Sequence, residues 1–155
     1  MIVLNTRLAR GFSFKPFIFL PDWLKRMGAK DTLLYFLHEV AHYSSQKPLP
    51  FVWCIRYFLN KKFRLEKETD AYAIELVVKA HLLGVDYGVL LNHYASVINA
   101  QYWRVSDHGT IKGILASKAK TLSENENTIR LREEIRQKVE EIEAAKREEK
   151  RKGRL

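Results

Sequence analysis

The sequence predicts an α+β protein that is mostly helical, with a small N-terminal sheet and a long amphipathic helix at the C-terminus. Short apolar or alternating runs are confined to the residues before Pro21, and later apolar residues recur at helical spacing. The 155 residues are about one domain, and 46% hydrophobic residues can form a core without disulfides. This composition excludes a wholly disordered chain and a collagen-like one.

The first part of the chain predicts one or two strands. The short apolar or alternating runs lie at residues 2–4, 12–14 and 17–20. Pro21 closes the last run, because proline lacks the N–H that a strand ladder needs. A short helix is expected at residues 21–26, since proline pre-sets the backbone of a first helical turn and Gly28 can end the helix.

Four helices are predicted in the middle of the chain. Asp31 is a favourable N-cap for a helix over residues 32–43, which is apolar almost all round and should be buried. Residues 51–59 predict a second buried helix. The other two helices are expected over residues 64–83 and 87–102. Gly84 should end the longer one, because glycine is favoured just after a helix.

The end of the chain predicts one long helix. Ser123 and Glu126 have the spacing of a capping box, so the helix should start there and run to about residue 150. Its apolar stripe has spacings of four, four and three: Leu131, Ile135, Val139 and Ile142. The stripe can dock on the domain or form a coiled coil, which leaves an oligomer open. We therefore divide the chain into a domain over residues 1–118 and a basic amphipathic helix over residues 119–155.

Basic residues are in excess, with 27 Lys and Arg against 18 Asp and Glu and a formal net charge of +9. Six of the positive charges lie in the last ten residues, interrupted by two glutamates. Such a tail allows a nucleic-acid partner. That partner is not favoured, because no nucleic-acid-binding motif is present and the basic run is mixed with acids.

The cysteine content and the apolar runs predict a cytoplasmic protein without a membrane span. Cys54 is the single cysteine, so no intramolecular disulfide can form. The longest apolar-rich stretch, residues 48–59, contains Arg56 and is too short to cross a bilayer. The first ten residues contain no cleavable apolar segment of a secretory signal.

Residues 38–42, HEVAH, form an HExxH motif within a predicted helix. Positions i and i+4 share a helix face, so the imidazoles of His38 and His42 can reach one metal ion. Glu39 can lean over the open side of the ion and take a proton from water held there. Two imidazoles and a carboxylate suit Zn²⁺, and a metal would supply the partners that buried polar side chains need.

A third ligand is expected from the acidic cluster that opens the third of these helices. On a helical wheel, Glu66 and Asp70 lie at the edge of the apolar face. Glu68 lies with Glu75 and Lys79 on a face that the wheel assigns to solvent. We therefore predict Glu66 as the third ligand, with Glu68 as the alternative. Asp70 can accept a hydrogen bond from a ligand histidine and so orient it.

HExxH followed by residues 64–73 resembles the gluzincin zinc peptidases. The pair of motifs is similar to those of their small intracellular or mobile-element members: ImmA-like and CAAX-protease-like catalytic domains and the minigluzincins. These domains place an edge strand and a short helix before HExxH, similar to residues 17–20 and 22–26. The resemblance implies a zincin-like core and a zinc-dependent peptidase that acts on a peptide or protein substrate.

In that family the second helix carries a glutamate ligand, an Asp or Asn four residues on, an aromatic residue and an alanine. This chain has the corresponding residues at Glu66, Asp70, Tyr72 and Ala73. The family usually has alanine before the Asp or Asn, where this chain has Thr69. A second register takes Glu68 as the ligand and Ala71 as the small residue, so both glutamates remain candidates.

Two functions are compatible with these residues. The first is a zinc metallopeptidase in which His38, His42 and Glu66 hold the metal and Glu39 activates water. The second is a metal-stabilised, peptidase-like scaffold whose basic C-terminal helix contacts nucleic acid or a partner protein. A purely structural metal site needs no general base, so the presence of Glu39 favours the enzyme.

Overall fold

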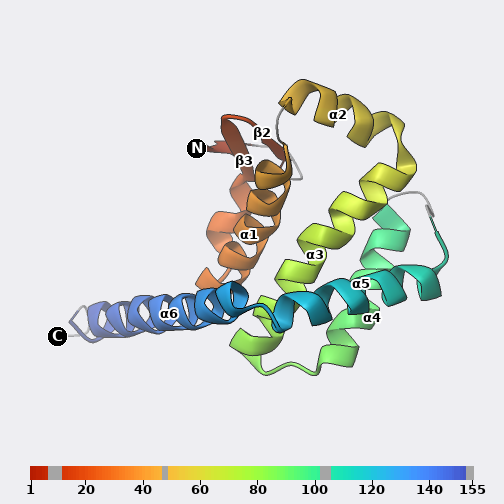
Figure 1. Cartoon of the computed structure of the whole chain (residues 1–155). Helices are drawn as coiled ribbons and strands as arrows, with labels where there is room; N and C mark the ends of the chain where they lie inside the picture. The colour runs from red at the N-terminus through yellow and green to blue at the C-terminus, as the bar shows by residue number, and fades with distance from the viewer. Residues whose placement is uncertain (7–11, 47–48, 102–105, 153–155) are drawn as a thin grey trace.

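The computed structural model describes residues 1–6, 12–46, 49–101 and 106–152 of the chain (Figure 1). Helices predominate, and one small sheet lies near the N-terminus, which confirms the mostly helical α+β class. The helices are η1 (Asp22–Arg26, a 3-10 helix), α1 (Ala29–Ser45), α2 (Pro50–Leu59), α3 (Lys61–Leu83), α4 (Tyr87–Gln101), α5 (His108–Ser123) and α6 (Glu126–Lys152). No helix in the described part of the chain is both long and apolar enough to cross a membrane.

The sheet has three strands, where the sequence predicted one or two. Its order is β1-β3-β2, so β3 (Phe17–Pro21) is central. β1 (Ile2–Thr6) runs parallel to β3, and β2 (Phe12–Phe14) runs antiparallel to it. Both outer strands pair with β3, so runs that are too short to be stable singly form one sheet together.

The sheet is fixed to η1 and α1 by apolar packing and by one buried amide. Ile18, Leu20 and Leu24 form a buried cluster against the aromatic side chains of α1. Gln46, directly after α1, is fully buried. Its amide nitrogen donates to the Ser13 carbonyl at 2.7 Å, and its amide oxygen accepts from the Lys15 N–H at 3.0 Å. These bonds hold the C-terminal half of α1, which carries His42, against the sheet.

α1 begins earlier than the sequence predicted. Gly28 occupies the N-cap position without a side-chain cap, and Asp31 lies in the first turn. The prediction of Asp31 as the N-cap is therefore wrong. An aspartate is stabilised in the first turn as well, because the helix dipole attracts a negative charge there, so the residue type alone does not separate the two positions.

α2 is not the buried helix that the sequence predicted. Trp53 is its buried residue, whereas Phe51, Ile55 and Phe58 are 69, 43 and 71% exposed. α2 packs against α3 along one side and otherwise lies at the edge of the molecule (Figure 1). An apolar composition permits burial on every side, but the fold supplies a packing partner for one side of α2.

α3 runs through the middle of the molecule (Figure 1). It begins after Asn60, whose side chain accepts a hydrogen bond from the Phe63 N–H at 3.0 Å. It ends at Gly84, as predicted, where a φ of 61° favours glycine. The largest core cluster lies between α3, α4 and α5 and includes Leu65, Leu76, Tyr94, Ile98, Ile111 and Leu115.

The last helix starts later than predicted. α5 continues to Ser123, and α6 begins at Glu126 after a turn at Asn125, whose side chain accepts from the Thr128 N–H at 3.3 Å. The prediction of Ser123 as an N-cap is wrong, since its hydroxyl donates back into α5. The predicted domain boundary after residue 118 falls inside α5, beside the fully buried Ala119.

α6 docks on the two helices that carry the HExxH motif and the acidic cluster. Ile135 and Val139 are buried against Leu34 of α1 and Val78 of α3. Ile142, farther along the stripe, is 45% exposed, and the side chain of Leu131 lies outside the described residues. The rest of α6 extends away from the domain (Figure 1).

We predict that Ile135→Ala lowers the free energy of unfolding by about 2 kcal/mol or more, because it leaves a cavity between α6, α1 and α3. Ile142→Ala is the matched control, and its effect should stay within about 0.5 kcal/mol. Urea unfolding followed by circular dichroism measures both. Equal losses in the two variants would contradict the docking of α6.

Candidate metal centre

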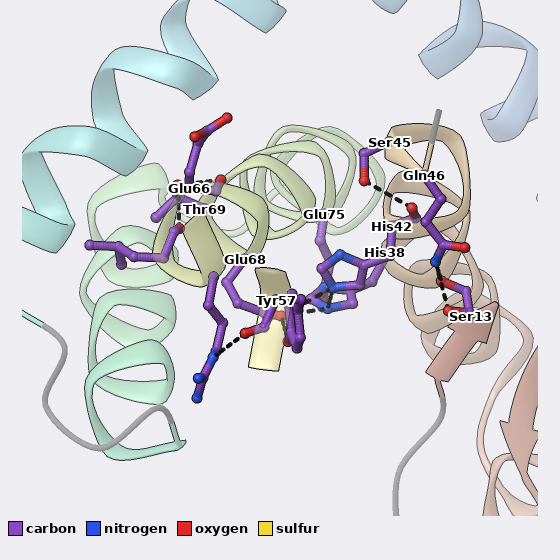
Figure 2. Close-up of polar contacts among 12 residues, drawn as sticks. Ser13, His38, His42, Ser45, Gln46, Tyr57, Glu66, Glu68, Thr69 and Glu75 are labelled. Carbon is purple, nitrogen blue, oxygen red and sulfur yellow. Dashed lines mark hydrogen bonds and ion pairs between the residues drawn. The ribbon is translucent and has the colours of Figure 1, made fainter. Parts of the chain in front are cut away.

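α1 and α3 bring three ligand-type side chains together: His38, His42 and Glu68 (Figure 2). All three are buried, with exposed fractions of 9, 8 and 0%. One ligand atom from each lies within 4.8 Å of the other two. Of the described residues, these form the one group of three or more His, Cys, Asp or Glu that could hold a metal ion.

The atoms that face one another in this group are the coordinating atoms. Glu68 Oε1 lies 3.3 Å from His42 Nε2, and Glu68 Oε2 lies 3.7 Å from His38 Nε2. The two Nε2 atoms are 3.1 Å apart. Two imidazole nitrogens that point at each other need either a shared proton or a shared cation. A divalent ion satisfies both rings in their neutral form, together with the carboxylate.

A buried oxygen without a hydrogen-bond partner is a second indication that the cluster can hold a cation. Glu68 Oε2, which faces His38 Nε2, makes no hydrogen bond to any described residue. Leaving such atoms unpaired in an apolar interior costs free energy, which coordination would offset. Two imidazole nitrogens and a carboxylate oxygen form a donor set that divalent transition metals prefer. The residues therefore fit a metal ion.

Glu68, not Glu66, lies at this cluster, so the helical wheel assigned these two side chains to the wrong faces. The Glu68 side chain is 1% exposed, whereas that of Glu66 is 56% exposed and pairs with Lys67 at 2.7 Å. The Glu66 side chain therefore does not belong to the ligand group of His38 and His42. The second register considered in the sequence, with Glu68 as the ligand, agrees with the geometry.

The wheel failed because α3 buries two faces. Leu65, Leu76 and their neighbours face α4 and α5, and this is the apolar face that the sequence shows. Glu68 lies on the other buried face, which packs against α1. That second face carries polar residues, so a wheel that equates polar with solvated places it in water.

Asp70 is not placed to orient a ligand histidine. Its side chain is 43% exposed and bonds to Lys118 of α5 and, at 3.4 Å, to Lys67. Glu75, and not Asp70, lies beside a histidine of the group, with its Oε2 atom 3.5 Å from His38 Nδ1. Its other oxygen accepts from the Tyr94 hydroxyl at 2.7 Å. Glu75 follows Glu68 by seven residues, or two helical turns, and this spacing was the available sequence signal.

Burial and neighbouring charges set the protonation of Tyr94 and His38, the two residues that contact Glu75. Burial, followed by the charge of Glu75 and the hydrogen bond to it, raises the pKa of the Tyr94 phenol, so the hydroxyl remains a donor. Burial lowers the pKa of His38, but the hydrogen bond to Glu75 and the charges of Glu68, Glu75 and Glu39 outweigh it. The net pKa lies above the usual value. A carboxylate beside Nδ1 fixes the ring with Nε2 directed at the cluster.

Tyr57 of α2 is a further contact that the sequence did not reveal. Its hydroxyl donates to Glu68 Oε1. Burial raises the pKa of Glu68, but His42 as a hydrogen-bond and charge partner, then His38 and Tyr57, lower it to about 2. The Glu68 carboxylate is therefore ionised, as a ligand must be. The signal for Tyr57 was weak, because it is one of several aromatic residues in the apolar run.

Arg64 fixes the end of α2 that carries Tyr57. Its guanidinium donates to the carbonyl of Tyr57 at 2.9 Å and to that of Phe58 at 2.7 Å. These carbonyls belong to the last turn of α2, which has no helical partners for them. The inner face of α2 also stacks Trp53 on Tyr57, with ring centroids 5.0 Å apart. α2 is thereby held over one side of the cluster.

Glu39 follows His38 on α1 and is 4% exposed. Its Oε2 atom has no hydrogen-bond partner among the described residues. Burial raises the pKa of Glu39, and the nearby histidines oppose this shift in part. Glu39 is thus a buried carboxylate beside the cluster that stays outside the three-residue ligand group.

Comparison of the chain with protein-family models, with curated proteins and with solved structures finds no match.

We predict that Glu68→Gln lowers metal affinity by more than the roughly 10- to 100-fold typical of losing an outer-sphere partner, because it removes an ionised ligand. Glu66→Gln is the matched control and should bind metal as the wild type does. Competition with a chromogenic chelator measures both affinities. Loss of metal in Glu66→Gln with retention in Glu68→Gln would contradict the assignment.

Glu75→Ala should lower metal affinity by about 10- to 100-fold, since it frees the His38 ring that it orients. Asp70→Ala, on the same helix but paired with Lys118, should leave the affinity unchanged. Chelator competition together with thermal melting separates a metal effect from loss of fold. An equal loss of affinity in both variants would show that Glu75 has no specific part.

Proposed function

We propose that this chain is a zinc-dependent metallopeptidase of the gluzincin type. One observation carries the proposal: Glu39 is a buried carboxylate beside the metal-ligand group, yet its Oε2 atom is not taken up by a hydrogen bond among the described residues. A structural metal site has no use for such a group, and a hydrolytic site needs one. Its place within HExxH, on the same helix as two ligand histidines, supports the same function.

Zinc is the metal we propose for His38, His42 and Glu68. Two imidazoles and one carboxylate would hold the ion, and three protein ligands of this kind are typical of catalytic rather than structural zinc. When bound, such an ion acts as a Lewis acid toward water and toward a peptide carbonyl. Glu75 and Tyr57 would hold the ligands His38 and Glu68 in place from outside.

Glu39 has the protonation chemistry of a general base. Its Oε2 atom would accept a proton from the water whose oxygen adds to the scissile carbonyl carbon. The same oxygen would then return that proton to the amine nitrogen as the C–N bond breaks. Burial raises the pKa of Glu39 toward a working pH, which makes the carboxylate a stronger base toward the water.

The alternative scaffold function rests on the basic C-terminal helix. Along α6, cations pair with acids of the same helix: Arg130 with Glu134, Arg136 with Glu133 and Lys138 with Glu141. Pairing of this kind reduces the free positive charge that a nucleic acid would attract. These pairs count against nucleic acid as the partner of α6.

We predict that Glu39→Gln retains bound zinc and a normal thermal transition but lowers peptidase turnover by about 10²- to 10⁴-fold. The change keeps the size of the side chain and removes its basicity. Turnover of unfolded casein by zinc-loaded protein measures the activity, and mass spectrometry of the native protein measures the zinc.

Glu66→Gln serves as the control, because it removes an exposed glutamate of the neighbouring helix at no cost to the proposed machinery. Its turnover should equal that of the wild type. Equal turnover in Glu39→Gln and the wild type would refute the peptidase and leave the scaffold function.

A further inference from the structure

The outer face of α2 is exposed and apolar although α2 contributes to a buried site. Its exposed side chains are Phe51, Val52, Ile55, Phe58 and Leu59, and Leu49 directly before the helix is also exposed. Phe58 and Leu59 are 71 and 80% exposed. An exposed apolar cluster of this kind marks an interaction surface more often than isolated exposed residues do.

The exposed residues form one stripe. At about 100° per residue, the five side chains of α2 fall within about 120° of its circumference. Trp53 and Tyr57 fall on the opposite side, which faces α3 and the metal-ligand group. The outer stripe is therefore free of the packing that holds α2 in the fold.

Cations outnumber acids along the chain that carries this stripe. Residues 40–65 contain no Asp or Glu. Arg56 borders the stripe and lies over the Phe63 ring, with its guanidinium carbon 4.4 Å from the ring centroid. Lys61 and Lys62 follow at the end of α2 and are exposed. Glu66, the first acid after this stretch, is exposed and pairs with Lys67 at 2.7 Å. The surface thus combines an apolar stripe with an edge on which cations are in excess.

We infer that the outer face of α2 docks the protein on an anionic membrane surface. An amphipathic helix with aromatic and aliphatic side chains on one face and cations beside them lies in the plane of a lipid interface. Its apolar side chains enter the acyl region, while Arg56, Lys61 and Lys62 contact anionic headgroups. The helix has ten residues, so it rests on the surface and does not cross it.

A second copy of the chain is a poorer occupant of this face. A symmetric dimer through α2 would oppose the same cations on both partners, and Glu66, the first acid after residues 40–65, already pairs with Lys67 of its own chain. An anionic lipid surface compensates them directly. The inference stands apart from the proposed peptidase function, since it requires neither bound metal nor turnover.

Docking would place the metal-ligand group close to the lipid. Tyr57 contacts Glu68 from the inner face of the same helix whose outer face would meet the membrane. The thickness of one helix, about 10 Å, would then separate the ligand group from the lipid surface.

The test is sedimentation of the full chain with vesicles of phosphatidylcholine alone and of phosphatidylcholine with phosphatidylglycerol. The wild type should bind the anionic vesicles, and more weakly as salt is raised. Phe51→Asp/Phe58→Asp should lower the partition coefficient at least about tenfold, because it removes both aromatic anchors. Met27→Asp/Val89→Asp is the matched control, since it adds the same charge at exposed apolar residues elsewhere and should bind as the wild type does.

A second pair of variants tests the cations. Lys61→Gln/Lys62→Gln should weaken binding to anionic vesicles by roughly fivefold for each charge removed. Lys138→Gln/Arg147→Gln removes the same charge from exposed positions of α6 and should have little effect. Far-UV circular dichroism and thermal melting establish that each variant is folded.

Three results would overturn the inference. The first is a wild type that fails to sediment with anionic vesicles. The second is equal binding by Phe51→Asp/Phe58→Asp and the wild type. The third is a wild type that forms a concentration-dependent dimer and does not bind vesicles, with the dimer abolished in Phe51→Asp/Phe58→Asp. That result would assign the face to a second copy of the chain. A protein that binds vesicles but turns over no casein leaves the inference intact and counts against the peptidase alone.

Discussion

The packing of α3 against α1 is the constraint on which the site depends. It places a fully buried carboxylate, Glu68, against the imidazoles of His38 and His42, whose Nε2 atoms face each other. Three such groups are stable in an apolar interior when a cation or protons neutralise them. α4 and α5 pack on the opposite side of α3. α6 docks on α1 and α3 together, so much of the fold holds these two helices in contact.

α2 connects the site to the surface of the molecule. Tyr57 reaches Glu68 from its inner face, and Arg64 of α3 bonds the last carbonyls of the helix. These polar contacts and the Trp53 ring hold α2 from its inner side, while its outer apolar stripe stays exposed. A short helix can therefore contribute to a buried site with one face and present an interaction surface with the other.

The sequence predicted the parts of the site that lie within one helical turn, and it failed where the answer depended on packing between helices. HExxH places two imidazoles on one helix face through local i, i+4 geometry, and Gly84 defines a helix end through a local backbone preference. Glu68 and Glu75 were assigned to solvent because α3 buries a polar face that no wheel of α3 alone can reveal. The exposed face of α2 was missed for the converse reason, since composition does not state which apolar residues find a partner.

The most direct test of the metal centre is an anomalous difference map, measured at the zinc absorption edge, from crystals of the zinc-loaded protein. We expect one peak within about 2.0–2.2 Å of His38 Nε2, His42 Nε2 and a Glu68 oxygen. Glu39 should lie beside the peak without coordinating it. A map without a peak at this cluster, or with the peak held by Glu66 or by Glu39, would contradict the account.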